Sequence, residues 1–193
     1  MKPLFSIITP TLQRPSLLRC CESVDRQTFQ SWEHLIFVDA EILNGELAAK
    51  VSHEQRAFLV PGVRYNDYGN TPRHLAWGHA TAEWIIYCDD DNYIASPDTL
   101  LYLSLALEKL PQNTKFAIFP ILRHSQRFFN DPPGLCMSDT ANVVVRREVG
   151  RWPAIQDYTA DGIWIEALKA KYKYAAFPDF DPIVVMEKSN LGL

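Results

Sequence analysis

The chain has 193 residues, of which 47% are hydrophobic and 22% are charged, a composition typical of one globular domain. Nineteen Lys and Arg stand against 23 Asp and Glu, and the net charge of −4 argues against a protein that works by neutralising nucleic-acid phosphates. We therefore expect no nucleic-acid partner. No apolar run approaches the roughly 20 residues of a membrane-spanning helix, so we also expect no transmembrane segment and no signal peptide.

The four cysteines match neither a disulfide framework nor the paired spacing of zinc ligands. Cys20 and Cys21 are adjacent, whereas Cys88 and Cys136 are isolated. This usage predicts reduced thiols in a cytoplasmic protein. Because Cys88 lies in an apolar run, we expect its side chain to act as a small core hydrophobe.

Short apolar runs alternate with segments of helical period, which indicates strands and helices that take turns in a mostly parallel sheet. We therefore predict an α/β fold with helices on both faces of a mostly parallel central sheet. The strands are expected at residues 4–9, 34–39, 63–66, 84–88, 116–122, 140–145, 174–177 and 183–186. The helices are expected at residues 15–24, 45–58, 71–80, 97–110 and 158–172. Residues 123–138 have two prolines, one glycine and no periodicity, so they are predicted to form a long surface loop.

Three consecutive aspartates, Asp89 to Asp91, directly follow the apolar strand predicted at 84–88. Like charges repel at close range, and a divalent cation would compensate them. Alternate residues of a strand point to the same side, so Asp89 and Asp91 can face one site while Asp90 points elsewhere. Hard oxygen ligands suit Mg²⁺ or Mn²⁺. A solvated acidic loop with Asn92 in a turn is the alternative, but ligands bind at the carboxyl ends of parallel strands, where this cluster lies.

Other polar residues follow the remaining predicted strands at the same edge of the sheet. They are Thr9, Arg14, Asp39, Asn70 and Arg73. The carboxylate of Asp39 can accept the imide N–H of uracil, and the planar fork of Arg73 can clamp a diphosphate. Taken singly, Asp39 suits a turn or a helix cap equally well, and Arg73 suits an ordinary surface position. Together with a metal site, they describe a nucleotide pocket.

Two stretches of the chain resemble family 2 glycosyltransferases. Residues 5–39 (FSIITPTLQRPSLLRCCESVDRQTFQSWEHLIFVD) match the family pattern of a strand, a P-T-x-x-R turn, a helix ending in Q-T, an aromatic residue and a strand ending in V-D. Residues 69–94 (GNTPRHLAWGHATAEWIIYCDDDNYI) resemble the segment from the arginine helix to the D-x-D motif. The resemblance covers residues 4–110 well and 139–172 more loosely.

The resemblance implies the Rossmann-like GT-A fold and one catalytic domain at residues 1–193. Residues 1–110 would bind the nucleotide sugar and the metal, and residues 111–193 would bind the acceptor. It implies a nucleotide-sugar donor, a glycan or other hydroxyl acceptor, Mn²⁺ or Mg²⁺, and inversion at the anomeric carbon. UDP-hexose is the expected donor, because Asp39 suits uracil. The chain ends soon after the predicted core, which is compatible with one module of a larger polypeptide.

The resemblance also assigns residues to the site. The donor side comprises Thr9, Pro10, Arg14, Asp39, Asn70, Arg73, Asp89 and Asp90, and the metal ligands are Asp91 and Asp89. The family's catalytic base belongs to an E-D pair that opens a late helix, and Asp161 fills that place here, with Ala160 where the glutamate would be. Asp157 is the second candidate for the base. Asp161 could also serve only the helix N-terminus through the macrodipole.

Two alternative functions come from other classes. A non-catalytic nucleotide-sugar-binding module would keep the fold without the base, and the broken E-D pair favours it. A metal-dependent phosphohydrolase can also carry D-x-D after a strand. In that group the motif follows the first strand, whereas here it follows the fourth and leads into Asn92. None of the five histidines is assigned to a metal.

Overall fold

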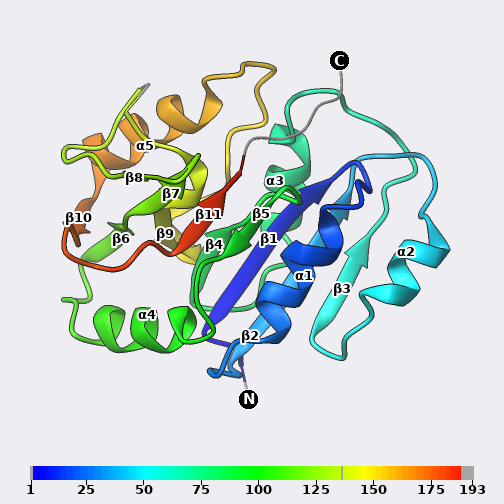
Figure 1. The fold of residues 1–193 in the computed structure, drawn as a ribbon. Coiled ribbons are helices and arrows are strands. Elements are labelled where there is room, and N and C mark those ends of the chain that lie inside the picture. The colour runs from blue at the N-terminus through cyan, green and yellow to red at the C-terminus, as the bar shows by residue number, and fades with distance from the viewer. Residues whose placement is uncertain (1, 136, 188–193) are drawn as a thin grey trace.

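The computed structural model describes residues 2–135 and 137–187, and its main feature is a seven-stranded sheet (Figure 1). The strand order is β10-β6-β9-β4-β1-β2-β3. Its strands are β1 (Phe5–Thr11), β2 (Trp32–Val38), β3 (Arg56–Leu59), β4 (Trp84–Tyr87), β6 (Thr114–Ile118), β9 (Val143–Arg146) and β10 (Lys173–Ala176). All neighbouring strands are parallel except β9, which runs antiparallel to both β4 and β6. The predicted α/β fold with a mostly parallel sheet is confirmed.

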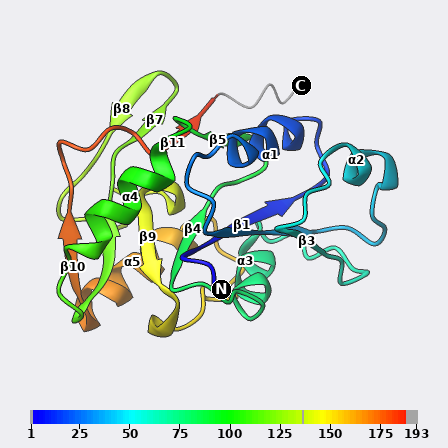
Figure 2. The ribbon, with the colours of Figure 1, turned by 90° about the horizontal axis from the view of Figure 1, so that it is seen from below.

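Helices cover both faces of this sheet (Figure 2). They are α1 (Leu17–Asp25), α2 (Gly45–Lys50), α3 (Asn70–Trp77), α4 (Thr99–Glu108) and α5 (Ala160–Lys171), with short 3₁₀ turns η1 (Thr140–Asn142) and η2 (Arg147–Val149). Alternation along β1 separates the two layers. Ile7 packs with α1 and α4, whereas Ile8 packs with α3 and α5. Among the described residues, no helix is long and apolar enough to cross a bilayer.

A second sheet of four short strands packs into the core that α1 and α4 share. Its order is β5-β11-β7-β8, with β5 (Asn92–Ile94), β11 (Val184–Met186), β7 (Ile121–Arg123) and β8 (Gln126–Phe128). The strand predicted at 116–122 is therefore two strands, β6 and β7, in different sheets. Proline 120 separates them, because it has no N–H to donate to a ladder.

Three other predictions differ from the structure. The loop predicted at 123–138 begins with a hairpin, in which the turn residues His124 and Ser125 have φ of 50° and 66°. Such turns usually carry Asn or Gly, so His124 and Ser125 did not indicate a hairpin. The helix predicted at 45–58 is shorter and ends at Lys50. The third strand of the chain, β3, begins at Arg56, whereas the sequence predicted it at 63–66. The buried guanidinium of Arg56, bonded to Asp25 at 2.6 Å, fixes that strand.

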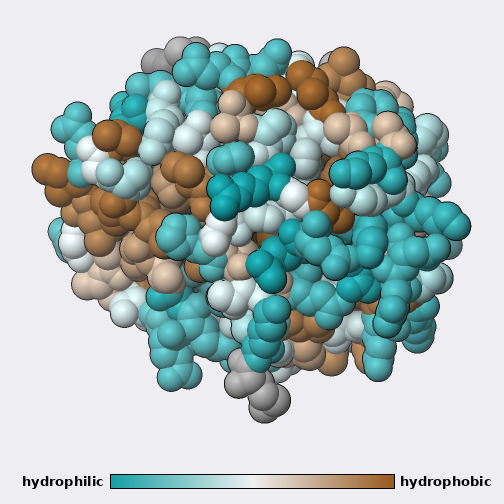
Figure 3. Space-filling view, turned by 180° about the vertical axis from the view of Figure 1, so that it is seen from behind, coloured by the Kyte–Doolittle hydropathy of each residue, from teal (hydrophilic) through white to brown (hydrophobic). Residues whose placement is uncertain are grey.

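The prediction that Cys88 packs in the core is confirmed. Cys20, Cys21 and Cys88 are free and buried, and Cys88 lies in the core beside Cys20. Cys136 lies outside the described residues. On the outside, hydrophilic side chains cover most of the face seen from behind, and apolar side chains gather in smaller areas (Figure 3).

Replacement of Ile86 by alanine tests how far β4 supports the fold. Ile86 is buried and pairs with Ile7 and Val144 on the neighbouring strands. The cavity left behind is expected to lower the free energy of unfolding by about 2–5 kcal/mol, measured by urea denaturation. Ile42→Ala is the control, because Ile42 is exposed, and its effect should stay within about 0.5 kcal/mol. Equal effects of the two substitutions would contradict the central place of β4.

Candidate functional site

A cavity of about 900 Å³ opens at the carboxyl edge of β1, β2 and β4. Its walls come from the turn after β1, the loop between β3 and α3, the aspartates after β4, the β7–β8 turn and the segment that enters α5. Of the predicted site residues, those that line the cavity are Pro10, Arg14, Asp39, Asn70, Arg73, Asp89, Asp91 and Asp161. Thr9, Asp90 and Asp157 do not line it. The fold therefore brings most of the predicted site together in one place.

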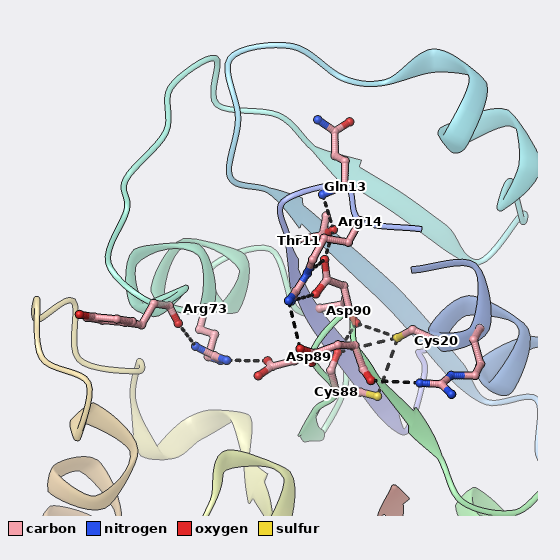
Figure 4. Close-up of polar contacts among 12 residues, drawn as sticks. Thr11, Gln13, Arg14, Cys20, Arg73, Cys88, Asp89 and Asp90 are labelled. Carbon is pink, nitrogen blue, oxygen red and sulfur yellow. Dashed lines mark hydrogen bonds and ion pairs between the residues drawn. The ribbon is translucent and has the colours of Figure 1, made fainter. Parts of the chain in front are cut away.

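Arginines, rather than a cation alone, compensate the three aspartates (Figure 4). Asp89 Oδ1 lies 2.5 Å from Arg73 Nη2. Asp90 is completely buried, where it pairs with Arg14 and accepts the hydroxyl of Thr11 at 2.6 Å. Asp89 and Asp91 both line the cavity and Asp90 points away from it, so the alternation predicted for a strand end is present.

Burial and the neighbouring charges together set the direction in which the pKa values of Arg14 and Asp91 shift. Burial opposes the charge of Arg14, but the hydrogen bond and charge of Asp90 outweigh it and raise the pKa of Arg14. Burial raises the pKa of Asp91, and the charge of Asp89 adds to this effect, while Arg14, 3.1 Å away, lowers it. Asp91 thus carries a carboxylate that a further positive charge would stabilise.

Arg73 is buried at the wall of the cavity and is held from three sides. Its Nη1 donates to the carbonyl of Tyr68 at 2.9 Å, its Nη2 pairs with Asp89, and its guanidinium lies 5.5 Å from the ring centroid of Trp152. Burial opposes its charge, but Asp89 outweighs this and raises the pKa of Arg73. Its Nε is buried without a hydrogen-bond partner in the part of the chain that the structure describes. The guanidinium is therefore fixed in place and fully charged.

Asn70 is committed to the protein itself. Its Nδ2 donates to the carbonyls of Ile155 and Asp157, both at 2.9 Å, and its Oδ1 accepts from Trp152 Nε1 at 3.2 Å. These bonds tie the start of α3 to the segment that leads into α5. Asn70 lines the cavity, but its amide shapes the wall rather than offering free polar atoms.

Thr9 is fully buried and does not line the cavity. Its hydroxyl donates to the carbonyl of Cys88 at 2.6 Å and accepts from His34 Nε2 at 2.9 Å. Nε2 carries the proton because Arg56 Nε donates to His34 Nδ1 at 3.0 Å. Burial lowers the pKa of His34, and the charge of Arg56 lowers it further, so the ring stays neutral. Thr9 thus supports the strand end from which the aspartates extend.

Thr11, two residues further along β1, lines the cavity where Thr9 does not. Asp39 follows β2 and is nearly buried. Its Oδ1 accepts the N–H of Tyr65 at 2.6 Å and fixes the loop before α3. Its Oδ2 has no hydrogen-bond partner among residues 2–135 and 137–187, which leaves one oxygen for a ligand.

The two candidate bases differ in position and in charge. Asp161 lies in the first turn of α5, lines the cavity and has its pKa raised by burial, although the N–H of Gly162 opposes this at 2.7 Å. Asp157 is exposed. The N–H and hydroxyl of Thr159 bond its Oδ1 and lower its pKa. The structure therefore directs Asp161, and not Asp157, toward the cavity.

Asp139 and Arg123 line the cavity but were not predicted. Asp139 caps η1 by accepting the N–H of Ala141 at 3.0 Å, and Asn142 completes a capping box. Burial raises the pKa of Asp139, and the charge of Asp89 contributes, while Arg123 lowers it. The D-x-x-N spacing before an apolar run is a signal that could have found this cap.

Neither a protein-family model nor a curated protein sequence matches the chain. Solved structures do match it at low sequence identity. TarS 1–349 from S. aureus matches with a TM-score of 0.75 and 14% identity, over 95% of this chain and 60% of that chain. Its complex with UDP-GlcNAc matches with a TM-score of 0.74 and 14% identity, over 96% of this chain and 58% of that chain. A mannosyltransferase from Pyrobaculum calidifontis, in complex with GDP-Man and Mn²⁺, matches with a TM-score of 0.76 and 17% identity, over 100% of this chain and 59% of that chain.

These TM-scores extend over 95–100% of this chain, so the likeness concerns its whole fold. The chain has the GT-A fold. The expectation drawn from the resemblance is thus confirmed for the fold. The chain spans about 60% of the length of TarS 1–349 and of the mannosyltransferase.

The buried position of Asp139 predicts a pH-dependent stability. Because its pKa is raised in the folded state, the ionised form opposes folding, and the free energy of unfolding falls as the pH rises above about 4. Asp139→Asn keeps the cap and removes this fall, so the variant should be more stable than the wild type at neutral pH and equal to it in acid. Urea unfolding across the pH range measures this.

Asp157→Asn is the matched control with the opposite sign. The pKa of Asp157 is lowered, so its contribution to stability is present at neutral pH and disappears as the pH falls through the folded-state pKa. This variant should therefore lose stability at neutral pH. If Asp139→Asn also lost stability at neutral pH, this would contradict the prediction that the buried charge of Asp139 opposes folding.

Proposed function

We propose that the chain is an inverting glycosyltransferase of the family 2 type, which moves a hexose from a UDP-sugar to a hydroxyl of a glycan or other acceptor. One observation carries the proposal. Asp39, Arg73, Asp89, Asp91 and Asp161, which suit a nucleobase, a diphosphate, a metal and a general base, line a single cavity at the carboxyl edge of a GT-A sheet.

The donor would lie along the first half of the chain. The free oxygen of Asp39 can accept the imide N–H of uracil, while Pro10 and Thr11 form the floor beside it. Arg73 is the cation for the diphosphate, and its burial makes its charge act with little screening by water. Complexes of the matched proteins with UDP, UDP-GlcNAc and GDP-Man favour a nucleotide-sugar donor.

Asp89 and Asp91 would hold Mn²⁺ or Mg²⁺. Within the described part of the chain, His, Cys, Asp and Glu form no group of three or more that could hold a metal ion. Two cavity-lining carboxylates fit an ion that takes its remaining ligands from substrate phosphates and water. When bound, such an ion stabilises negative charge on a departing diphosphate. The mannosyltransferase complex with Mn²⁺ supports this assignment.

Asp161 would act as the base in a single displacement. The acceptor oxygen forms a bond to the anomeric carbon while the bond from that carbon to the diphosphate oxygen breaks, and the nucleoside diphosphate leaves with the electron pair. Attack opposite the leaving group inverts the configuration. Asp161 accepts the hydroxyl proton, and burial favours this because it raises the pKa of the carboxylate toward the working pH. Arg73 stabilises the leaving group electrostatically.

Metal-dependent UDP binding is the first test. UDP with Mn²⁺ should raise the melting temperature, with about 2.7 kcal/mol of stabilisation at a hundredfold excess over Kd. A chelator or Asp91→Asn should abolish most of this shift in melting temperature. The chelator removes the cation, and the substitution removes one of the two carboxylates that would hold it. Asp179→Asn, an exposed aspartate away from the cavity, is the control. An equal shift in the chelator would contradict the metal site.

Asp161→Asn tests the base. The variant should bind UDP like the wild type but release UDP from UDP-glucose or UDP-GlcNAc, in the presence of a glycan panel, at least about 100-fold more slowly. Asp157→Asn should retain activity. Equal losses in both variants, or none, would place the base elsewhere. A wild-type chain that binds UDP-sugars without releasing UDP would instead be a binding module, and hydrolysis of p-nitrophenyl phosphate would indicate a phosphohydrolase.

A further inference from the structure

Two strongly exposed tyrosines meet at the rim of the cavity. Tyr68 is 68% exposed and Tyr158 is 76% exposed, and both line the cavity. Tyr68 belongs to the loop between β3 and α3, whereas Tyr158 precedes α5, far along the chain. Their ring centroids lie 5.4 Å apart with the planes at 79°, an edge-to-face contact. The fold thus brings together two aromatic rings from segments that are far apart in the sequence.

The core does not account for these rings. The neighbouring Tyr65 packs on Phe37 and belongs to the buried layer beside α3, but the Tyr68 and Tyr158 rings touch each other and solvent. Their hydroxyls have no hydrogen-bond partner among the residues that the structure describes. Single exposed aromatic residues are ordinary on protein surfaces. Two that converge on one cavity leave an apolar surface facing a ligand site.

The backbone of Tyr68 is held firmly although its ring is free. Its φ is 60°, in the left-handed region that costs non-glycine residues energy. Its carbonyl accepts from Arg73 Nη1 at 2.9 Å. Gly69 follows with φ of 79°, and a Cβ at Gly69 would lie 3.0 Å from Arg73 Nη1 and 3.2 Å from Pro10. The loop therefore places Tyr68 at the rim through contacts with donor-side residues.

The other side of the pair is fixed next to the proposed base. Tyr158 lies between Asp157 and Thr159 in the chain, and the carboxylate of Asp157 accepts hydrogen bonds from the N–H and the hydroxyl of Thr159. The side chain of Asn70 donates to the carbonyl of Asp157. Asp161 lies three residues after Tyr158, in the first turn of α5. The pair therefore stands between Arg73, on the diphosphate side, and Asp161, on the side where an acceptor hydroxyl must arrive.

The chemistry of this pair suits a sugar ring. One side of a pyranose ring presents C–H groups that pack on an aromatic face, while its hydroxyls remain free at the edges to reach a base. A flexible hydroxyl compound without a ring offers no such apolar face. We propose that Tyr68 and Tyr158 form an acceptor subsite for a pyranose ring, so that the acceptor of the proposed transfer is itself a sugar residue. This subsite rests on the proposed function, since Asp161 must act on the bound ring.

Saturation-transfer difference NMR tests the subsite directly. The probes are methyl α- and β-pyranosides of glucose, galactose, mannose and N-acetylglucosamine, with glycerol as a hydroxyl compound without a ring. Spectra are recorded with diamagnetic Mg²⁺, both with and without UDP, on irradiation of upfield methyl protons of the protein. We expect transfer to the C–H protons of at least one pyranoside and none to glycerol. The double variant Tyr68→Ala, Tyr158→Ala should lose this signal.

Matched variants separate the subsite from folding. Tyr68→Phe with Tyr158→Phe should keep the pyranoside signal, because the ring faces remain. Tyr102→Ala removes an exposed tyrosine on α4 that does not line the cavity, so it should change nothing. The single variant Tyr158→Ala serves if the double variant does not fold, as judged by its thermal unfolding.

The outcomes distinguish the two proposals. UDP signals without any pyranoside signal would overturn the subsite and leave the donor site intact. A pyranoside signal without UDP binding would overturn the donor proposal alone. Loss of the uracil signal of UDP in the double alanine variant, with unchanged pyranoside signals, would assign the pair to the nucleobase and overturn the acceptor subsite. So would pyranoside signals that the alanine variants leave unchanged.

Discussion

The buried carboxylate of Asp90 is the constraint on which the site depends. A fully buried charge costs several kcal/mol unless it is paired and hydrogen-bonded. Arg14 and Thr11 meet both requirements, since Thr11 is the last residue of β1 and Arg14 belongs to the turn that follows it. The pairing joins the end of β4 to the end of β1, so that the two neighbouring strands finish at one edge. Asp89 and Asp91 then emerge on the cavity side, and their positions follow from the partner of the residue between them.

Charge pairing with arginines also stabilises the three adjacent carboxylates of Asp89, Asp90 and Asp91. Each carboxylate has an arginine within 3.1 Å, and each arginine comes from a different segment than the aspartates. The site is therefore held together by charge pairing that a ligand must partly replace. A diphosphate and a cation can do so, because the phosphate satisfies the arginines and the cation satisfies Asp89 and Asp91.

Much of this arrangement could be predicted from the sequence because it depends on local patterns. The apolar run of β4 followed by aspartates, and the rule that ligands bind at carboxyl ends of strands, predicted which residues gather at one edge of the sheet, and most of them line one cavity there. Long-range partners could not be read this way. Nothing local shows that Thr9 bonds Cys88, that Asn70 ties two loops, or that Asp139 faces the cavity, because each depends on segments that meet only in the fold. Strand boundaries failed where the turn residues were atypical, as at His124.

The guanidinium of Arg73 donates at once to the Tyr68 carbonyl and to Asp89. The N–H groups of a guanidinium lie in one plane at fixed angles. A ligand that draws Nη2 away from Asp89 therefore also changes the hydrogen bond from Nη1 to the Tyr68 carbonyl. The two sides of the cavity are thus linked thermodynamically through one side chain. Such linkage is reciprocal: whatever occupancy of the diphosphate side does to affinity at the tyrosine rim, occupancy of the rim does to affinity for the diphosphate. Through this one side chain, binding at either side would change the affinity at the other by the same factor.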